Sequence, residues 1–300
     1  MSDVQDMSYF LKCVFGGALA CGLTHTIITP LDLIKCKRQV SPELYKSLGD
    51  GFSKIRAENG LRGLTLGWGP TFVGYSLQGM GKFGFYELFK NIYGKALGDD
   101  AEKYKVYGWI LSAACAEVIA DAFLCPWEAL KVRMQTSKPG QFPTTFSQGF
   151  AKMKKEEGMK GFYKGLAPLW ARQVPYTIVK FVYFEKCVSM FYSKVFNKKP
   201  KHEYSKSVQL SVTFMSGYLA GIICAIVSHP ADTMVSKLNN VAGSGSVASS
   251  VKNIYSEIGF MGLWRGLSTR IVMIGTLTGL QWYIYDTFKT ICGLKTSGGK

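Results

Sequence analysis

The amino-acid sequence predicts an all-α membrane protein with six transmembrane helices, arranged as three tandem repeats of about 100 residues. Two observations lead to this fold class. Three short phrases each recur three times in nearly constant register, and long windows without charged residues alternate with basic segments. The predicted repeats cover residues 1–100, 101–200 and 201–300. Because separate phrases keep the same spacing, we interpret the pattern as a triplicated structural unit and not as chance similarity.

The first phrase is a proline followed two residues later by an acid and, in two copies, by a base three residues after that acid. Its copies begin 96 and 104 residues apart, at Pro30, Pro126 and Pro230. The second phrase holds two glycines three residues apart and begins at Gly60, Gly158 and Gly259. The third phrase ends in an acid, at Glu87, Glu185 and Asp286. The second and third phrases both recur at offsets of 98 and 101 residues.

Each repeat contains two predicted membrane spans. Asp, Glu, Lys and Arg are absent from residues 13–31, 63–81, 207–228 and 271–285, whereas the apolar windows 106–124 and 165–184 contain a few charges. Most of these windows are long enough to cross a hydrocarbon core of about 30 Å as a helix. A soluble helical protein is the alternative, but its buried helices would usually be shorter and would seldom recur in pairs. Between the spans we expect short amphipathic helices at 51–58, 146–156 and 247–257.

Composition narrows the classes of function. The net charge is +16, and the basic residues concentrate between the spans, which suits anionic solutes and anionic membrane lipids such as cardiolipin. Nucleic acid is not an expected partner because no binding motif accompanies the basic residues. The sequence has no Walker loop, nucleophile elbow or zinc motif, so neither an enzyme nor a bound cofactor is expected. The eight cysteines have no paired metal-site spacing and are interpreted as reduced thiols.

The threefold phrase P-x-[DE]-x-x-[KR] at this period resembles the mitochondrial carrier family over essentially the full chain. The resemblance implies tilted helices around a central cavity, a multi-pass position in the mitochondrial inner membrane, both termini on the cytosolic side, and alternating access between two ion-pair gates. It implies a matrix gate made of Asp32, Lys35, Glu128, Lys131 and Asp232. It implies a cytosolic gate made of Tyr86, Glu87, Lys90, Glu185, Tyr285, Asp286 and Lys289.

Each implied gate departs from the family pattern at one position. Val235 stands where the third matrix base is expected, and Val188 stands where the second cytosolic base is expected. Both gates therefore have three acids and only two bases at motif positions. On the matrix side we expect Asp32 to pair with Lys131 and Asp232 with Lys35, which leaves Glu128 without a motif partner.

Residues that break the threefold pattern inside the spans are candidates for solute contact, because a small solute does not share the symmetry of the repeats. The positively charged and amide candidates for substrate binding are Arg172, Lys180, Lys82, Arg270 and Gln78. The candidates that can exchange a proton are His25, Glu117 and Asp121. Charges at membrane depth are costly and usually functional. Structural ion pairing and helix-packing hydrogen bonds remain open as alternatives.

The asymmetric residues resemble the phosphate-transporting branch of the family, notably Thr24-His25, Tyr75-Ser76-Leu77-Gln78-Gly79, Ala116-Glu117 and Arg172-Gln173-Val174-Pro175-Tyr176. This resemblance implies import of inorganic phosphate with a proton; the alternative is another small anion such as a dicarboxylate. Cys36 replaces an expected hydroxyl residue, and with Cys21 it resembles the members associated with copper. The two thiols are candidate Cu(I) ligands. Their spacing puts them about 22 Å apart along a straight helix, too far to hold one ion together.

Overall fold

The computed structural model describes residues 7–41, 43–137, 140–196, 200–240, 247–264 and 267–298, and these residues form helices and loops without strands. In the first repeat the helices are α1 (Met7–Ile27), α2 (Thr29–Val40), α3 (Leu48–Gly63) and α4 (Trp68–Leu97). In the second they are α5 (Lys105–Thr136), α6 (Phe146–Tyr163) and α7 (Leu166–Met190). In the third they are α8 (Lys206–Asn240), α9 (Val247–Gly262) and α10 (Leu267–Ile291). Short helical turns η1 (Gly98–Ala101), η2 (Phe191–Val195) and η3 (Lys201–Glu203) connect the longer helices.

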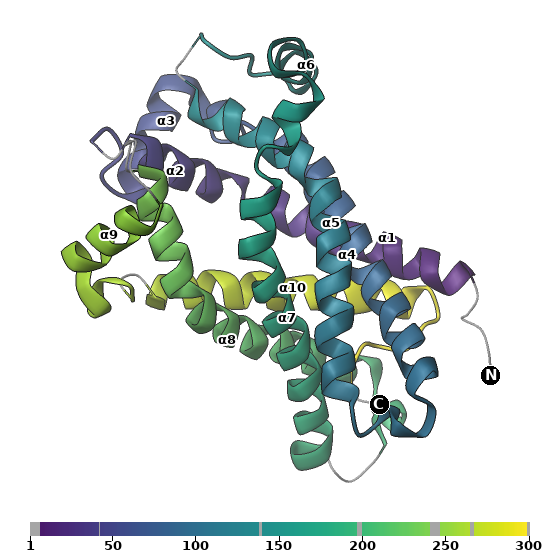
Figure 1. The fold of residues 1–300 in the computed structure, drawn as a ribbon. Helices are drawn as coiled ribbons and strands as arrows, with labels where there is room; N and C mark the ends of the chain where they lie inside the picture. The colour runs from purple at the N-terminus through teal and green to yellow at the C-terminus, as the bar shows by residue number, and fades with distance from the viewer. Residues whose placement is uncertain are drawn as a thin grey trace.

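The long helices form a closed ring. Helices in contact follow the order α1, α4, α5, α7, α8 and α10, and α10 again contacts α1 (Figure 1). The short helices α3, α6 and α9 lie together toward one end, which we call the matrix end after the orientation that the family resemblance implies. The opposite end, near the C-terminus, is called the cytosolic end. Each repeat thus supplies two long helices and one short helix between them, as the sequence predicts.

Proline and glycine shape each repeat. The first long helix is interrupted beside Pro30, so that α1 ends at Ile27 and α2 begins at Thr29, whereas α5 and α8 continue through their prolines. The first glycine of the second phrase adopts a left-handed conformation in every repeat, with φ of 64°, 63° and 63° at Gly60, Gly158 and Gly259. A side chain is disfavoured at such a φ, which explains why this position is glycine three times. These kinks turn the chain from the short helix toward the next long helix.

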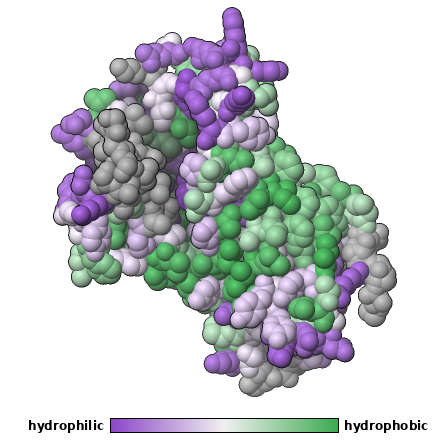
Figure 2. Space-filling model, viewed as in Figure 1, coloured by the Kyte–Doolittle hydropathy of each residue, from purple (hydrophilic) through white to green (hydrophobic). Residues whose placement is uncertain are grey.

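An apolar band crosses the middle of the molecule and separates more polar regions at its two ends (Figure 2). By length and composition, three helices in the described part of the chain qualify as membrane spans, at residues 7–27, 105–136 and 206–230. The second long helix of each repeat carries more polar residues. For example, α4 begins at Trp68 and runs to Leu97, later and further than the predicted charge-free window 63–81. The charge of Lys82 did not end the span, because its side chain is buried inside the ring and does not face lipid.

Candidate transport site

Two carboxylates lie in the centre of the ring. Glu117 and Asp121 project from α5, one helical turn apart, and both residues are 0% exposed. The Nε2 atom of Gln78 on α4 donates hydrogen bonds to both, over 2.9 Å to Glu117 Oε1 and 3.0 Å to Asp121 Oδ1. Lys82, one turn further along α4, places its Nζ atom 3.0 Å from the same Glu117 oxygen. Among the described contacts, these two acids have one ion pair, from Lys82 to Glu117, and a proton on either carboxyl group would balance the charge of these three side chains.

A second polar chain joins helices of the other repeats to α1. Lys180 on α7 donates a hydrogen bond to the side-chain oxygen of Gln281 on α10. The amide nitrogen of Gln281 in turn lies 3.4 Å from both Thr24 Oγ1 and His25 Nδ1. The His25 ring also stacks on Tyr75, with centroids 3.7 Å apart and planes 8° from parallel. Among the described contacts, His25 reaches Gln281 and not the two carboxylates, so the expected proton relay has no direct hydrogen bond at this point.

The two arginine candidates lie nearer the matrix end than Lys180. Arg172 occupies α7 two turns before Lys180 and is exposed. Arg270 on α10 donates a hydrogen bond from Nη2 to Ser228 Oγ over 3.0 Å. Of the five substrate candidates, the structure therefore brings Gln78, Lys82 and Lys180 into the buried centre and places both arginines outside it.

On the matrix side, Lys131 lies between two acids. Its Nζ atom is 2.5 Å from Asp32 Oδ2 on α2 and 3.2 Å from Glu128 Oε2 on its own helix. The expectation that Glu128 lacks a partner was therefore wrong, because acid and base three residues apart share one helical face. Lys35 is exposed, and its expected partner Asp232 lies outside the residues whose side chains the structure describes.

Two layers of aromatic side chains close the ring on the cytosolic side of the central cluster. Each layer takes one residue from each of α4, α7 and α10: Phe83, Phe181 and Trp282 form one, and Tyr86, Phe184 and Tyr285 form the other. Every one of these residues is at most 1% exposed, and neighbouring rings lie 3.5–6.0 Å apart, centroid to centroid. The sequence analysis missed the first layer, although its members follow Lys82, Lys180 and Gln281 directly and keep the threefold register.

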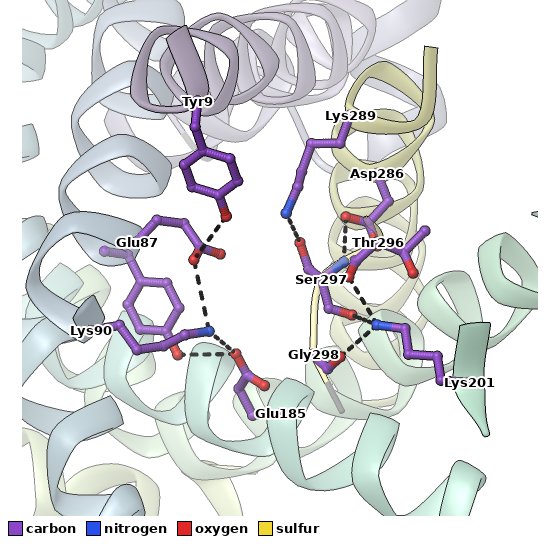
Figure 3. A network of polar contacts seen from close by, with 11 residues as sticks. Tyr9, Glu87, Lys90, Glu185, Lys201, Asp286, Lys289, Thr296, Ser297 and Gly298 are labelled. Atoms are coloured by element: carbon purple, nitrogen blue, oxygen red, sulfur yellow. Dashed lines mark hydrogen bonds and ion pairs between the residues drawn. The ribbon is translucent and has the colours of Figure 1, made fainter. Parts of the chain in front are cut away.

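Beyond these layers lies the polar network of Figure 3. Lys90 pairs with Glu185 over 2.7 Å, so α4 is joined to α7, and its Nζ atom is 3.9 Å from Glu87. The Tyr86 hydroxyl donates to the same Glu185 oxygen over 3.4 Å, and Tyr9 of α1 donates to Glu87 over 3.5 Å. The described cytosolic gate residues of the first two repeats are thus in contact with one another. Tyr9 also contacts this group, although it belongs to none of the repeated phrases and was not predicted from the sequence.

The third repeat closes its part of the network differently. Asp286 accepts a hydrogen bond from Thr213 Oγ1 over 2.8 Å, and Lys289 donates to the side chain of Ser297 over 3.1 Å. Ser297 lies close to the C-terminal end of the chain, so part of the gate is supplied by a segment outside the repeated phrases. Tyr285 belongs to the aromatic layer and is fully buried.

The two candidate copper thiols lie on different helices. Cys21 is buried on α1, and Cys36 is half-buried on α2. Within the described part of the chain, no group of three or more His, Cys, Asp and Glu side chains could hold a metal ion.

The sequence profile of the family described as "Mitochondrial carrier protein" matches the chain three times, at residues 6–97, 102–195 and 206–295. Curated relatives are similar along nearly the whole chain. The "Probable mitochondrial phosphate carrier protein" of Schizosaccharomyces pombe is 52% identical over 97% of this chain and 93% of its own length. The "Phosphate carrier protein, mitochondrial" of Caenorhabditis elegans is 53% identical over 95% and 82%. "Solute carrier family 25 member 3" of Bos taurus is 52% identical over 96% and 77%.

Proposed function

The chain belongs to the mitochondrial carrier family, and we propose that it carries inorganic phosphate into mitochondria together with a proton. It is a multi-pass protein of the mitochondrial inner membrane that transports phosphate, and carriers of this family are transporters. The finer part of the proposal is the proton and the residues that handle it. It rests on the buried pair Glu117 and Asp121, which share Gln78 and have one cation, Lys82, beside them.

The membrane potential gives the reason for a proton. Moving one negative charge into a matrix-negative compartment costs about 2.3 kcal/mol for every 100 mV of potential. A proton carried with monovalent phosphate cancels that charge. A buried carboxyl group with a neighbouring acid is a suitable carrier, because burial and the second negative charge both favour its protonated form. We propose that Glu117 and Asp121 accept the proton and that His25, at a matching height on α1, exchanges it with the solute.

For the anion, we propose contact with Lys82, Lys180 and Gln78 at the centre and with the two arginines on the matrix side. An Arg guanidinium can bind phosphate through two parallel hydrogen bonds, and Lys provides a compact positive charge. Arg172 and Arg270 lie toward the matrix end of α7 and α10. A solute released from the centre would therefore pass fixed positive groups on its way to the matrix.

We propose that the two charged networks act as alternating gates. In this conformation the aromatic layers and the Lys90–Glu185 pair close the cytosolic side. Opening toward the cytosol would break that pair and separate the layers. On the matrix side, Lys131 with Asp32 and Glu128 would provide the corresponding closure, together with Lys35 and Asp232.

Uptake of labelled phosphate into liposomes that contain the purified protein tests the proposal. We expect uptake to rise when the interior is alkaline and to fall when an ionophore collapses the pH gradient. If the rate of phosphate uptake is the same with the alkaline interior and after the ionophore has collapsed the pH gradient, proton coupling is excluded. Uptake of a labelled dicarboxylate at the phosphate rate would favour the alternative small anion.

Two further partners are proposed. Exposed basic residues on α6, such as Lys154 and Lys155, provide charge for anionic lipids, and we expect liposomes with cardiolipin to support faster uptake than liposomes without it. The thiols of Cys21 and Cys36 are proposed as two separate binding sites that Cu(I) occupies one after the other during transport, since soft thiolates prefer that ion. If the double variant Cys21→Ser/Cys36→Ser still carries phosphate and accumulates as much copper as the unmodified protein, the copper proposal must be dropped.

A further inference from the structure

The last described residues of the chain are buried in the cytosolic gate. After α10 ends at Ile291, the chain turns back, and Thr296 and Ser297 are only 6% and 5% exposed. Figure 3 shows this end of the chain lying between Asp286 and Lys289 on one side and Lys201 on the other. Segments outside helices are usually mobile unless specific contacts hold them. The contacts of residues Thr296–Gly298, which we call the C-terminal latch, are therefore informative.

Ser297 binds Asp286 and Lys289, the two charged cytosolic gate residues of α10. Its backbone N–H donates to the Asp286 carboxylate and lies 2.9 Å from each oxygen. Its hydroxyl accepts a hydrogen bond from Lys289 Nζ over 3.1 Å. A single residue outside the repeated phrases thus binds both the acid and the base that α10 contributes to the cytosolic gate.

The latch is also fixed to the beginning of the third repeat. Lys201 Nζ donates to three consecutive carbonyl oxygens, those of Thr296, Ser297 and Gly298, over 2.8, 3.0 and 2.6 Å. Thr296 Oγ1 donates to Gln209 Oε1 on α8 over 3.0 Å. An ammonium group has three protons to donate, so one lysine satisfies all three carbonyl oxygens of the latch.

The latch lies where a family base is missing. Val188 on α7 occupies the position of the second cytosolic base and is 1% exposed. A Cβ atom added to Gly298 would lie 3.0 Å from the Cβ atom of Val188, so the backbone of the latch packs directly on this valine. A lysine or arginine at position 188 would need the space that the latch fills, and it would offer Asp286 the N–H donor that Ser297 now provides.

We propose that the C-terminal latch, held by Lys201, completes the cytosolic gate in place of the missing base at Val188. The proposal rests on the alternating-access function above. The latch follows α10, is hydrogen-bonded to Lys201 and to Gln209 of α8, and packs on Val188 of α7, so these helices can separate at their cytosolic ends only when the latch leaves those contacts. Asp286 and Lys289 hold Ser297 in the position that makes these contacts. The latch therefore stabilises the conformation that is closed to the cytosol.

Cys13 provides a reporter for the closed state. It lies on α1 one helical turn beyond Tyr9, is 0% exposed, and belongs to the packed cluster that contains Phe83 and Tyr285. In intact mitochondria, a membrane-impermeant maleimide can reach this thiol only while the cytosolic side is open. The fraction of modified Cys13 is measured by mass spectrometry of its peptide in the full chain, so the result does not depend on expression level.

Three changes to the chain end are compared. Deletion of residues 296–300 removes the latch, and Ser297→Pro removes the N–H donated to Asp286 together with the hydroxyl that accepts a hydrogen bond from Lys289. We expect both to accelerate Cys13 modification about tenfold or more, the size expected for loss of a hydrogen bond to a charged group. The side chain of Lys295 is exposed, so in the control Lys295→Ala the maleimide should modify Cys13 as fast as in the protein without substitutions.

A compensating substitution makes the test specific. In the protein that lacks residues 296–300, Val188→Lys should return Cys13 modification to the original rate, because the new ammonium can bind Asp286, whereas Val188→Met should not. Equal modification rates with and without residues 296–300 would overturn the proposal. If the full chain without substitutions failed to take up phosphate, the proposed transport function would be wrong. The difference in Cys13 modification rate between the proteins with and without residues 296–300 would still test whether the latch holds the cytosolic side closed.

Discussion

Lys82 and Glu117 form an ion pair across two repeats at the centre of the ring, with Nζ 3.0 Å from Oε1 and side chains 5% and 0% exposed. Removing both ions from water is costly, and their attraction offsets that cost only while both partners are present. The pair is also asymmetric, because the positions equivalent to Glu117 in the first and third repeats are Cys21 and Gly221. It serves one site in the molecule and is not part of the repeated framework.

The first prediction follows from this pair. Lys82→Met should lower the free energy of unfolding by about 3–5 kcal/mol, because it leaves Glu117 buried without its cation. The double variant Lys82→Met/Glu117→Gln should recover much of that stability, since neither charge remains, but should not recover phosphate uptake. Thermal unfolding of the purified variants and uptake into liposomes measure the two effects separately. Additive losses of stability would show that the two side chains are not energetically coupled.

Comparison of the three repeats identified residues that the structure brings together at the centre of the ring. Gln78 and Glu117 were selected because their equivalents in the other repeats differ in type, and the structure joins them by a hydrogen bond of 2.9 Å. Such a comparison works because helices in equivalent places present equivalent positions to the centre. The same register also contained Phe83, Phe181 and Trp282, but apolar residues in a membrane span resemble ordinary packing positions and gave no reason to select them.

The rest could not be predicted, because it depends on contacts between segments that share no pattern. Ser297 has no counterpart in the first two repeats, and neither its burial nor its bond to Asp286 has a periodic signal. Likewise, nothing in the sequence distinguishes Tyr9 from other interfacial tyrosines, although it reaches Glu87. The sharing of Lys131 by Asp32 and Glu128 depends on side-chain conformations that the sequence does not fix.

The second prediction concerns Arg172. Arg172→Lys keeps the positive charge but removes the planar guanidinium group, which can donate two parallel hydrogen bonds to phosphate. We expect uptake at low phosphate concentration to fall about tenfold, the effect of losing one charge-assisted hydrogen bond. The matched control is Arg56→Lys on α3, also exposed, which should transport normally. Wild-type uptake by Arg172→Ala at normal membrane abundance would remove this residue from the substrate path.

The third prediction concerns the matrix gate. Lys131 is shared by two acids, and Val235 occupies the position of the base expected for Glu128. Val235→Lys should provide that base, so that Lys131 pairs with Asp32 only. The closed matrix gate should then be harder to open, and phosphate exchange should be slower. Val235→Met, which adds length without charge, is the control. An unchanged exchange rate in Val235→Lys would mean that an additional base at position 235 does not strengthen the closed matrix gate.

The fourth prediction is a dependence of stability on pH. Glu157 on α6 accepts a hydrogen bond from Lys164 over 3.1 Å and pairs with Arg133 of α5 over 3.0 Å. Chiefly the Lys164 hydrogen bond, and also the charge of Arg133, lower the pKa of Glu157 below its ordinary value. A depressed folded pKa gives stability that is present above the unfolded pKa and lost as pH falls through the folded value.

Glu157→Gln should therefore destabilise the protein at neutral pH and reduce the loss of thermal stability on acidification below the ordinary glutamate pKa. The size should be small, because the side chains are accessible to solvent. Melting temperatures between neutral and mildly acidic pH measure it, with Glu156→Gln as the control on the same helix. The prediction would be contradicted if the melting temperature fell equally with decreasing pH in Glu157→Gln and in the protein without substitutions.

The last prediction separates proton coupling from anion binding at Glu117. Glu117→Gln keeps the size of the side chain and an oxygen that can accept hydrogen bonds from Gln78 and Lys82, but it cannot bind and release a proton. Net uptake driven by a pH gradient needs that release in every cycle, whereas exchange of phosphate for phosphate returns the proton with the anion. We therefore expect gradient-driven uptake to fall at least about tenfold and exchange to retain a large part of its rate. The control Glu102→Gln makes the same chemical change at an exposed site and should alter neither rate. His25→Gln should show the same selective loss if histidine passes the proton to the solute. If Glu117→Gln keeps full gradient-driven uptake, Glu117 does not carry the proton, and its buried pair with Lys82 is structural.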